Sequence, residues 1–143
     1  MEMTENKDSG PGKKIIVVDD DEGILKTFFL LFNQAYRVYL AKDSIEALER
    51  FKSASFDLII VDYKLPRING LEMISRFREL GYRGPAILIS AYPEAIHKDD
   101  LKKYNVNQLF LKPLDLEALE SSIHRLLGTP AVREQSAAVA GKK

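Results

Sequence analysis

Short apolar runs alternate with amphipathic segments along most of this chain, and that alternation restricts the folds open to it. The runs that we expect to be strands are 14–19, 36–41, 56–62, 86–90 and 109–111. Apolar, β-branched runs of this length are typical of strands buried on both faces. Because parallel strands are joined by helical crossovers, the pattern predicts an α/β fold with a doubly wound, five-stranded parallel sheet.

The run 36–41 differs from the others because Tyr36, Val38 and Leu40 alternate with Arg37 and Tyr39. Alternation of this kind is typical of a strand with one face less buried than the other. We therefore expect this strand to be less buried than the first and to lie at an edge of the sheet.

Helices are expected between the strands. Helical spacing of apolar residues predicts helices at 22–34 and 70–80, a third that Asp43 caps, and a last one that Asp115 caps. Segment 93–104 has few apolar residues, and we expect only a short helix there. The inward-facing residues are expected to include Ile24, Leu25, Phe28, Leu31 and Phe32 in the first helix, Ile45, Leu48 and Phe51 in the second, Leu71, Ile74 and Phe77 in the third, and Leu116, Leu119, Ile123, Leu126 and Leu127 in the last.

The composition excludes several classes of function. Lys and Arg number 21, as do Asp and Glu, so the net charge of zero predicts no long-range attraction to nucleic acid or to an anionic membrane. The absence of cysteine excludes disulfides and cysteine-ligated metals. No apolar stretch approaches the roughly 20 residues that a membrane span needs, and no secretory signal is present. We expect a soluble, cytoplasmic protein.

The folded unit is expected to be 13–128. Residues 1–12 are charged and small, and Gly128-Thr129-Pro130 is a helix-stop signal followed by sequence without a clear amphipathic pattern. Disordered tails are therefore expected at 1–12 and 129–143.

Acidic residues end two of the expected strands. Asp19 and Asp20 follow the first apolar run, and Asp62 ends the third. In the strand order 2-1-3-4-5, which is an expectation from the fold class, the first and third strands are neighbours at the point where an open α/β sheet binds ligands. Three carboxylates brought together repel one another, so they must bind a cation or take up protons. Oxygen ligands favour Mg²⁺ or Mn²⁺ over zinc.

Two further strand ends suit phosphate chemistry. Ser90 ends the fourth run and offers a hydroxyl, while Lys112 ends the fifth and offers an ammonium group. A carboxylate beside a divalent ion can act as a nucleophile on phosphorus and form an acyl phosphate. Four of the five strands thus end in a residue suited to a metal and phosphoryl site.

These motifs identify a family resemblance. The segments Val17-Val18-Asp19-Asp20, Val61-Asp62-Tyr63-Lys64-Leu65-Pro66 with Gly70, Ser90-Ala91 and Lys112-Pro113 occur in the order and approximate spacing of one family. The chain resembles the receiver domain of two-component response regulators, of the chemotaxis-regulator type with a flavodoxin-like fold. The resemblance covers essentially all of 13–128, and the set of motifs is far more specific than any one of them.

The resemblance implies a phosphoacceptor and a metal site. Asp62 would accept a phosphoryl group from a sensor histidine kinase or a phosphotransfer protein. Asp20 and Asp62 would bind Mg²⁺ directly, and Asp19 mainly through water. The backbone carbonyl of Lys64 would be the third protein ligand.

It also implies a phosphoryl-binding set. Lys112 would pair with the phosphoryl group, Ser90 would donate a hydrogen bond to it, and the small Ala91 would leave room for the donor. The Lys112-Pro113 peptide bond would be cis. The output would be a shift of the face formed by the fourth and fifth strands and the helices that follow them, read by a downstream protein target that the sequence does not identify. A homodimer stays open.

The chain departs from the family pattern at one switch position. Many receivers carry an aromatic residue three positions before the lysine, whereas this chain has Leu109, which has no ring to turn inward. Lys64 and Tyr92 occupy positions that tune the lifetime of the phosphoryl group in this family. The sequence does not give the direction of their effect.

Other interpretations stay open at this stage. A simpler interpretation of Asp19 and Asp20 is that they only cap the helix that follows them. We predict that His97 and His124 lie at the surface. The chain is expected not to be an enzyme beyond its own phosphotransfer and autodephosphorylation. The alternatives are an interaction module that works without phosphorylation and, less favoured, a Mg²⁺-dependent phosphohydrolase. That enzyme class wants a second aspartate where this chain has Lys64. Too few residues follow 128 to build an output domain, so we expect a stand-alone regulator or a receiver from a larger protein.

Overall fold

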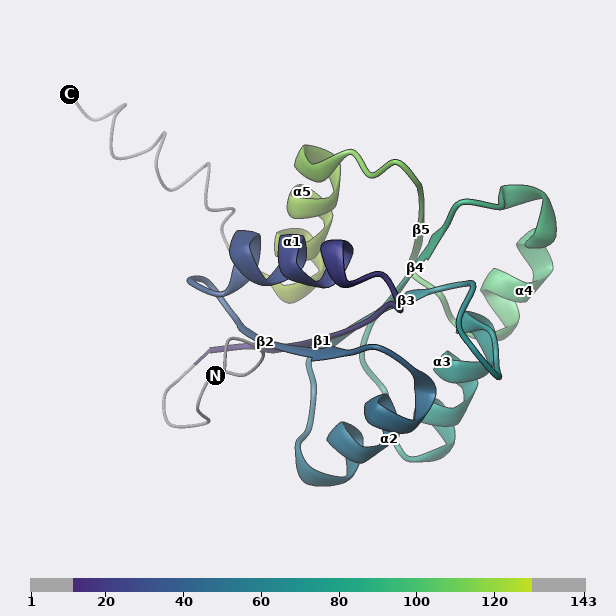
Figure 1. Ribbon diagram of the computed structural model, residues 1–143, viewed down its shortest axis with the longest axis horizontal. Helices are drawn as coiled ribbons and strands as arrows, with labels where there is room; N and C mark the ends of the chain where they lie inside the picture. The colour runs from purple at the N-terminus through teal and green to yellow at the C-terminus, as the bar shows by residue number, and fades with distance from the viewer. Residues whose placement is uncertain (1–11, 130–143) are drawn as a thin grey trace. The chain divides into compact units, whose positions relative to one another are not determined.

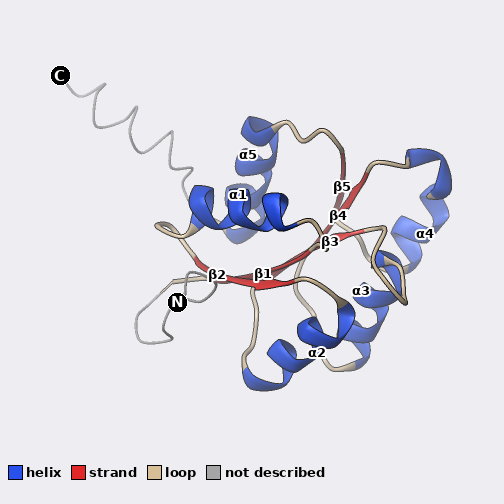
Figure 2. Cartoon of the chain, in the orientation of Figure 1, coloured by secondary structure: helices blue, strands red, loops and turns tan. Residues whose placement is uncertain are grey.

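The computed structural model describes residues 12–129, which divide into two compact units, one ending at Lys112 and the other beginning at Pro113. The first unit contains a five-stranded parallel sheet in the order β2-β1-β3-β4-β5 (Figures 1 and 2). The predicted α/β class and strand order are therefore confirmed. Most of the two predicted tails, residues 1–11 and 130–143, lies outside the described residues.

The elements follow the predicted order, with ends that differ by one or two residues. The strands are β1 (Lys14–Val18), β2 (Arg37–Ala41), β3 (Leu58–Asp62), β4 (Ala86–Ser90) and β5 (Gln108–Leu111). The helices of this unit are α1 (Glu22–Phe32), α2 (Ser44–Ser53), α3 (Gly70–Glu79) and α4 (Lys98–Lys103), with a 3-10 turn, η1 (Pro93–Ala95), before α4. The short helix expected within 93–104 is thus a turn followed by a six-residue helix.

Local side-chain caps set where the helices begin. The Asp21 carboxylate accepts a hydrogen bond of 2.8 Å from Gly23 N at the start of α1. Asn69 and Glu72 exchange side-chain to backbone hydrogen bonds of 2.9 and 2.8 Å at the start of α3, which forms a capping box. Such caps satisfy backbone N–H groups that have no partner within the helix. They also fix the loops that leave the carboxyl ends of β1 and β3.

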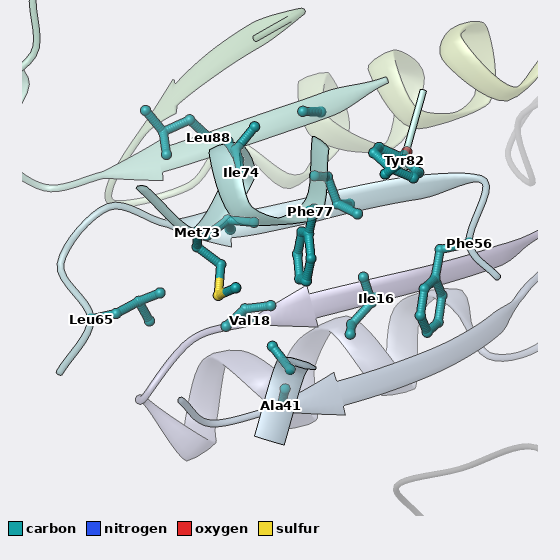
Figure 3. Close-up of a cluster of buried hydrophobic side chains, with 14 of the residues drawn as sticks. Ile16, Val18, Ala41, Phe56, Leu65, Met73, Ile74, Phe77, Tyr82 and Leu88 are labelled. Carbon is teal, nitrogen blue, oxygen red and sulfur yellow. The ribbon is translucent and has the colours of Figure 1, made fainter. Parts of the chain in front are cut away.

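The two faces of the sheet bury alternate residues of each strand. α1 covers one face, and α2, α3 and α4 lie on the other (Figure 1). On the latter face, side chains from the strands interlock with apolar residues of α3 (Figure 3). This alternation is what the twofold period of a strand requires. Members of this cluster include Ile16, Val18, Ile59, Val61, Leu71, Met73, Ile74, Phe77 and Leu88.

The burial of β2 differs from the prediction. β2 lies at the sheet edge, as expected, but its residues Val38–Ala41 are as fully buried as those of β1. Helices α1 and α2 both contact β2 and cover its two faces, so the alternation in its sequence did not mark an exposed face. One backbone carbonyl of β2 is also occupied, because Arg50 of α2 donates from Nε to Leu40 O at 3.1 Å.

Three residues predicted to face inward are exposed. Leu31 of α1, Ile45 of α2 and Leu116, near the Asp115 cap, retain 43%, 49% and 39% of their accessible surface, whereas Phe29 of α1 is buried. The apolar stripe of α1 is wider than the surface that the sheet can cover. The helix therefore buries the larger Phe28, Phe29 and Phe32 and leaves the leucine outside.

The second described unit contains α5 (Leu116–Leu127), which begins at the Asp115 cap, as predicted, and ends at Gly128 with φ of +69°. His124, predicted to lie at the surface, is buried. Its ring Nδ1 lies 3.0 Å from Thr129 Oγ1 and its Nε2 3.9 Å from a Glu120 carboxylate oxygen. These polar partners offset the cost of burying the ring, and nothing in the local sequence pattern showed them. His97 is exposed, as predicted.

Gly70 permits the close contact between the start of α3 and the end of β3. Its N–H donates to Tyr63 O at 2.7 Å, and a Cβ at this position would lie 2.5 Å from Asp62 O and 2.9 Å from Tyr63 Cα. Both are backbone atoms, so neither can move aside without shifting β3. Among the described residues, 12–129, no helix is long and apolar enough to cross a membrane.

Replacing Gly70 with alanine is expected to lower the free energy of unfolding by about 1–3 kcal/mol, because the added methyl group overpacks the backbone of β3. Urea denaturation of the two proteins measures the difference. The matched control is Gly23→Ala in the first turn of α1, where the new Cβ meets only the Asp21 carboxylate, at 3.2 Å. That variant is expected to be no less stable than the wild type. Equal losses in the two variants would contradict the proposed steric cause.

Candidate functional site

Three carboxylates converge at the carboxyl edge of the sheet. Asp19 and Asp20 follow β1, and Asp62 is the last residue of β3. β1 and β3 are paired neighbours, with Val18 opposite Val61, so both acidic segments leave the sheet at the same point. One oxygen from each carboxylate lies within 4.8 Å of the other two. The strand order thus brings together the three residues that the sequence analysis singled out.

Asp19 is held in place by three contacts. Its carboxylate Oδ1 accepts a hydrogen bond from Asp21 N at 2.9 Å, and its Oδ2 lies 3.2 Å from Lys112 Nζ. Its backbone N–H donates to Ala41 O at 3.0 Å, which extends the pairing of β1 with β2. Asp19 is almost fully buried, with 1% of its surface exposed, whereas Asp20 is exposed.

Lys112 bridges the two buried carboxylates. Its Nζ lies 3.1 Å from Asp62 Oδ1 as well as 3.2 Å from Asp19 Oδ2. The backbone N–H of Lys112 donates to Ser90 O at 2.9 Å, so the pairing of β5 with β4 determines where the side chain starts. A single ammonium group therefore faces two buried negative charges and a third nearby.

Burial and neighbouring charges shift the pKa values of Asp62, Asp19 and Lys112. Burial, together with the charge of Asp19, raises the pKa of Asp62 from its ordinary 3.8 to about 6, and Lys112 only partly offsets these effects. Burial likewise raises the pKa of Asp19. Burial works to lower the pKa of Lys112, but Asp19 and Asp62 together outweigh it and the pKa is raised. Each shift has the direction expected for a site that gains by taking up a cation.

The donor set fits a hard divalent cation. All three side chains offer carboxylate oxygens, no histidine or cysteine among residues 12–129 joins them, and the exposed Asp20 leaves the site open to solvent. Mg²⁺ prefers oxygen ligands and keeps several of its waters, so a site with few protein ligands and an open side suits it. Mn²⁺ has similar preferences.

A hollow of about 390 Å³ lies over Asp20 and Asp62. Its walls come from the loops after β1, β3 and β4 and from the end of β5, and they include Asp20, Asp62, Lys64, Ala91, Tyr92 and Lys112. Lys64 and Tyr92 contact each other, because Lys64 Nζ lies 5.0 Å from the centre of the Tyr92 ring. Little in the sequence indicated this contact. Lys64 lies two positions after Asp62, and Tyr92 lies two positions after Ser90.

Ser90 and Leu109 occupy the positions predicted for them. Ser90 ends β4, is buried, and accepts a hydrogen bond at its Oγ from Tyr92 N at 2.8 Å. Leu109 lies in β5 opposite Leu88 and is half-buried against the apolar cluster on the α3 side of the sheet. Leucine at this place supplies packing but no ring and no hydroxyl.

Comparison with known proteins shows the family to which this chain belongs. The model of the response regulator receiver domain matches residues 15–124. The chain therefore belongs to the response regulator receiver domain family of two-component systems. It is 32% identical over 115 residues to response regulator ArlR of Staphylococcus saprophyticus, covering 80% of this chain and 52% of ArlR. It thus spans about half the length of that relative. It is 27% identical over 116 residues to sporulation initiation phosphotransferase F of Bacillus subtilis, covering 80% of this chain and 94% of that protein.

Solved structures agree on the fold. The signal receiver domain of an HD domain-containing protein from Pseudomonas fluorescens superposes with a TM-score of 0.76 at 22% identity, covering 86% of this chain and 92% of that one. Response regulator TrrA from Thermotoga maritima, in complex with Mg²⁺-BeF, has a TM-score of 0.69 at 30% identity, covering 80% and 99%. The flavodoxin-like receiver fold of this chain is therefore shown.

Because the pKa of Asp62 is raised, the free energy of unfolding of the metal-free protein is expected to depend on pH. The folded state holds the proton of this carboxyl more tightly than the unfolded state, so stability falls as pH rises from about 4 to about 6. Asp62→Asn removes this effect. It should stabilise the metal-free protein at pH 7 by up to about 3 kcal/mol, at about 1.4 kcal/mol per pKa unit.

Urea unfolding in the presence of EDTA, repeated from pH 4 to pH 7.5, tests this. The stability difference between Asp62→Asn and the wild type is expected to grow with pH and then level off above pH 6. Asp99→Asn, which removes an exposed carboxylate of α4, is the control and should show no such growth. A difference that shrinks as pH rises would show that the shift has the opposite sign.

Proposed function

We propose that this chain accepts a phosphoryl group on Asp62 from the phosphohistidine of a sensor kinase or phosphotransfer protein and signals to a downstream protein. The observation that carries the proposal is the meeting of Asp62 with Asp19, Asp20 and Lys112 at the sheet edge, where Asp20, Asp62 and Lys112 line a hollow. Membership in the receiver family supports it, as do two relatives, a sporulation initiation phosphotransferase and a response regulator solved in complex with Mg²⁺-BeF.

The whole of 13–128 is proposed to work as one receiver domain, because the family match at 15–124 spans nearly all of it. A cytoplasmic location is proposed with it, since a chain without cysteine suits a reducing compartment.

The side chains of Asp19, Asp20 and Asp62, together with the backbone carbonyl of Lys64, would hold Mg²⁺ or Mn²⁺. Asp20 and Asp62 would bind it directly, and Asp19 mainly through water. When bound, the ion supplies charge neutralisation for the oxygens of the transferred group. The raised pKa values of Asp19 and Asp62 support this role, because a cation at the site would return both carboxyls to the ionised state.

The residues of the chain carry the transfer itself. An ionised Asp62 oxygen attacks phosphorus while the bond from phosphorus to the donor imidazole nitrogen breaks, which leaves an acyl phosphate on Asp62. Lys112, already 3.1 Å from Asp62, pairs with a phosphoryl oxygen as negative charge develops. Ala91, small and exposed at the mouth of the hollow, leaves room for the donor side chain.

Ser90 links the new group to the rest of the fold. Its Oγ accepts a hydrogen bond from Tyr92 N, and the same hydroxyl can donate to a phosphoryl oxygen. Movement of Ser90 toward the phosphoryl group shifts a conformational equilibrium in the segment between β4 and β5. Taking that equilibrium from 1:99 to 99:1 needs about 5.5 kcal/mol. Two or three charge-assisted hydrogen bonds, at about 1.5–3 kcal/mol each, approach that amount.

The proposal predicts that acetyl phosphate with Mg²⁺ adds one phosphoryl group to the wild-type chain, and that Asp62→Asn abolishes the addition because the nucleophile is gone. Intact mass spectrometry measures the added mass. Asp21→Asn is the matched control, because Asp21 lies beside the cluster and caps α1, a role that asparagine also fills. It should be phosphorylated like the wild type.

Uptake that persists in Asp62→Asn would overturn the assignment of the acceptor. No uptake by the wild type, together with no stabilisation by Mg²⁺ in thermal unfolding, would favour an interaction module that works without phosphorylation. Multiple turnover of a phosphomonoester would favour a phosphohydrolase. Lys64 stands where that class needs an acid, and its ammonium faces the Tyr92 ring.

Lys64 is proposed to lengthen the life of the acyl phosphate, because its side chain lines the hollow and its ammonium, once drawn to the phosphoryl oxygens, obstructs the path of water to Asp62. Lys64→Ala is expected to speed the loss of the phosphoryl group about two- to fivefold, the factor that corresponds to an exposed ion pair of about 0.4–1 kcal/mol. Intact mass recorded over time after removal of acetyl phosphate gives the rate.

Lys103→Ala is the matched control, since Lys103 makes a similar contact, 5.3 Å from the centre of the Tyr104 ring, on a part of the chain that does not line the hollow. It should leave the rate unchanged. A Lys64→Ala rate equal to or slower than that of the wild type would refute the shielding role.

A further inference from the structure

The segment between β4 and β5 is held very differently at its two ends. Beyond Tyr92 it runs through η1 and α4, neither of which contains a buried residue. Figure 1 shows it leaving the carboxyl end of β4 and returning to the start of β5. Only Ile96, Leu101, Tyr104 and Val106 pack, partly buried, against the apolar cluster. Such a weakly packed segment can change its position at low cost in free energy.

The far end of the segment is clamped. Arg78 of α3 donates from Nη1 to Gly84 O at 2.6 Å and from Nη2 to Asn105 O at 2.8 Å. Asn107 adds a reciprocal pair with Ala86, since Asn107 N donates to Ala86 O and Asn107 Oδ1 accepts from Ala86 N, both at 2.8 Å. Asn105 has φ of +56°, which completes a sharp turn after α4. These contacts tie the end of the segment to the starts of β4 and β5.

The near end depends on Tyr92. Its backbone N–H donates to Ser90 Oγ at 2.8 Å, and its ring faces Lys64 Nζ at 5.0 Å. Both partners lie at the candidate phosphorylation site, and both have a reason to move when a dianion forms there. The Ser90 hydroxyl can turn to donate to a phosphoryl oxygen, and the Lys64 ammonium is attracted to the same charge.

The usual place for a reporting aromatic is filled by Leu109, which packs against the core and cannot take that role. Tyr92 is 44% exposed, stands at the start of the weakly packed segment, and contacts two residues of the site, Ser90 and Lys64. Loss of either contact would release the ring and the turn that follows it.

On the condition that Asp62 is the phosphoacceptor, we propose that the contacts of Tyr92 with Ser90 and Lys64 form a latch that phosphorylation opens. The segment 91–104 then turns about the clamp of Arg78 on Asn105 and presents a changed surface to the protein target. Tyr92 is thus a positioning residue that acts through its neighbours, and it replaces the missing aromatic of β5.

Hydrogen exchange followed by mass spectrometry tests the latch on the full chain, with and without acetyl phosphate and Mg²⁺. In the wild type, phosphorylation is expected to raise the exchange rate of amides in 92–98 severalfold and to leave 105–107 unchanged. In Tyr92→Leu the latch is already open, so 92–98 should exchange fast before phosphorylation and change little after it. Tyr92→Phe keeps the ring and should behave like the wild type.

Intact mass on the same samples separates the latch from the proposed function. If Asp62 is phosphorylated while exchange in 92–98 stays the same, the latch is refuted and the acceptor stands. Equal behaviour of Tyr92→Leu and Tyr92→Phe would also refute it, because the ring would then carry no part of the contact. If no phosphoryl group is added, the proposed function fails and the latch fails with it.

Discussion

The repulsion among Asp19, Asp20 and Asp62 is the interaction on which the rest of the molecule depends. Two of these carboxylates are buried, and Lys112 is the cation that faces both. The folded chain therefore holds a pocket with more negative charge than Lys112 neutralises, and burial together with the charge of Asp19 raises the pKa of Asp62 to about 6. A divalent ion would offset that imbalance by its charge, and Lys112 would then be able to pair with the oxygens of a phosphoryl group.

Backbone pairing keeps this charged arrangement from relaxing. Asp19 N–H bonds to the end of β2, Lys112 N–H bonds to the end of β4, and Gly70 lets α3 press against the backbone of Asp62. The repelling groups are thus attached to a sheet whose register is set by buried apolar residues, not by the charges themselves. Burial of the apolar core stabilises the fold, and the repulsion among the carboxylates offsets part of that stabilisation.

Local signals in the sequence, the apolar runs and the residues that end them, predicted the strands and the candidate residues. The strand order, and with it the meeting of Asp19, Asp20 and Asp62, was an expectation from the fold class. Prediction from the sequence failed where burial depends on partners distant in the chain. Leu31 is exposed while Phe29 is buried, and α1 and α2 bury both faces of β2. The contact of Lys64 with Tyr92 could not be predicted, because two loops of no regular pattern determine it.

The contact of Arg50 with the outer edge of β2 has a consequence for the chain in a crowded solution. An uncovered edge strand offers a row of backbone groups to which a strand from another molecule can add. Because the guanidinium of Arg50 already occupies the carbonyl of Leu40, a foreign strand would have to displace it before joining the sheet. The Arg50 side chain thus disfavours edge-to-edge aggregation through β2.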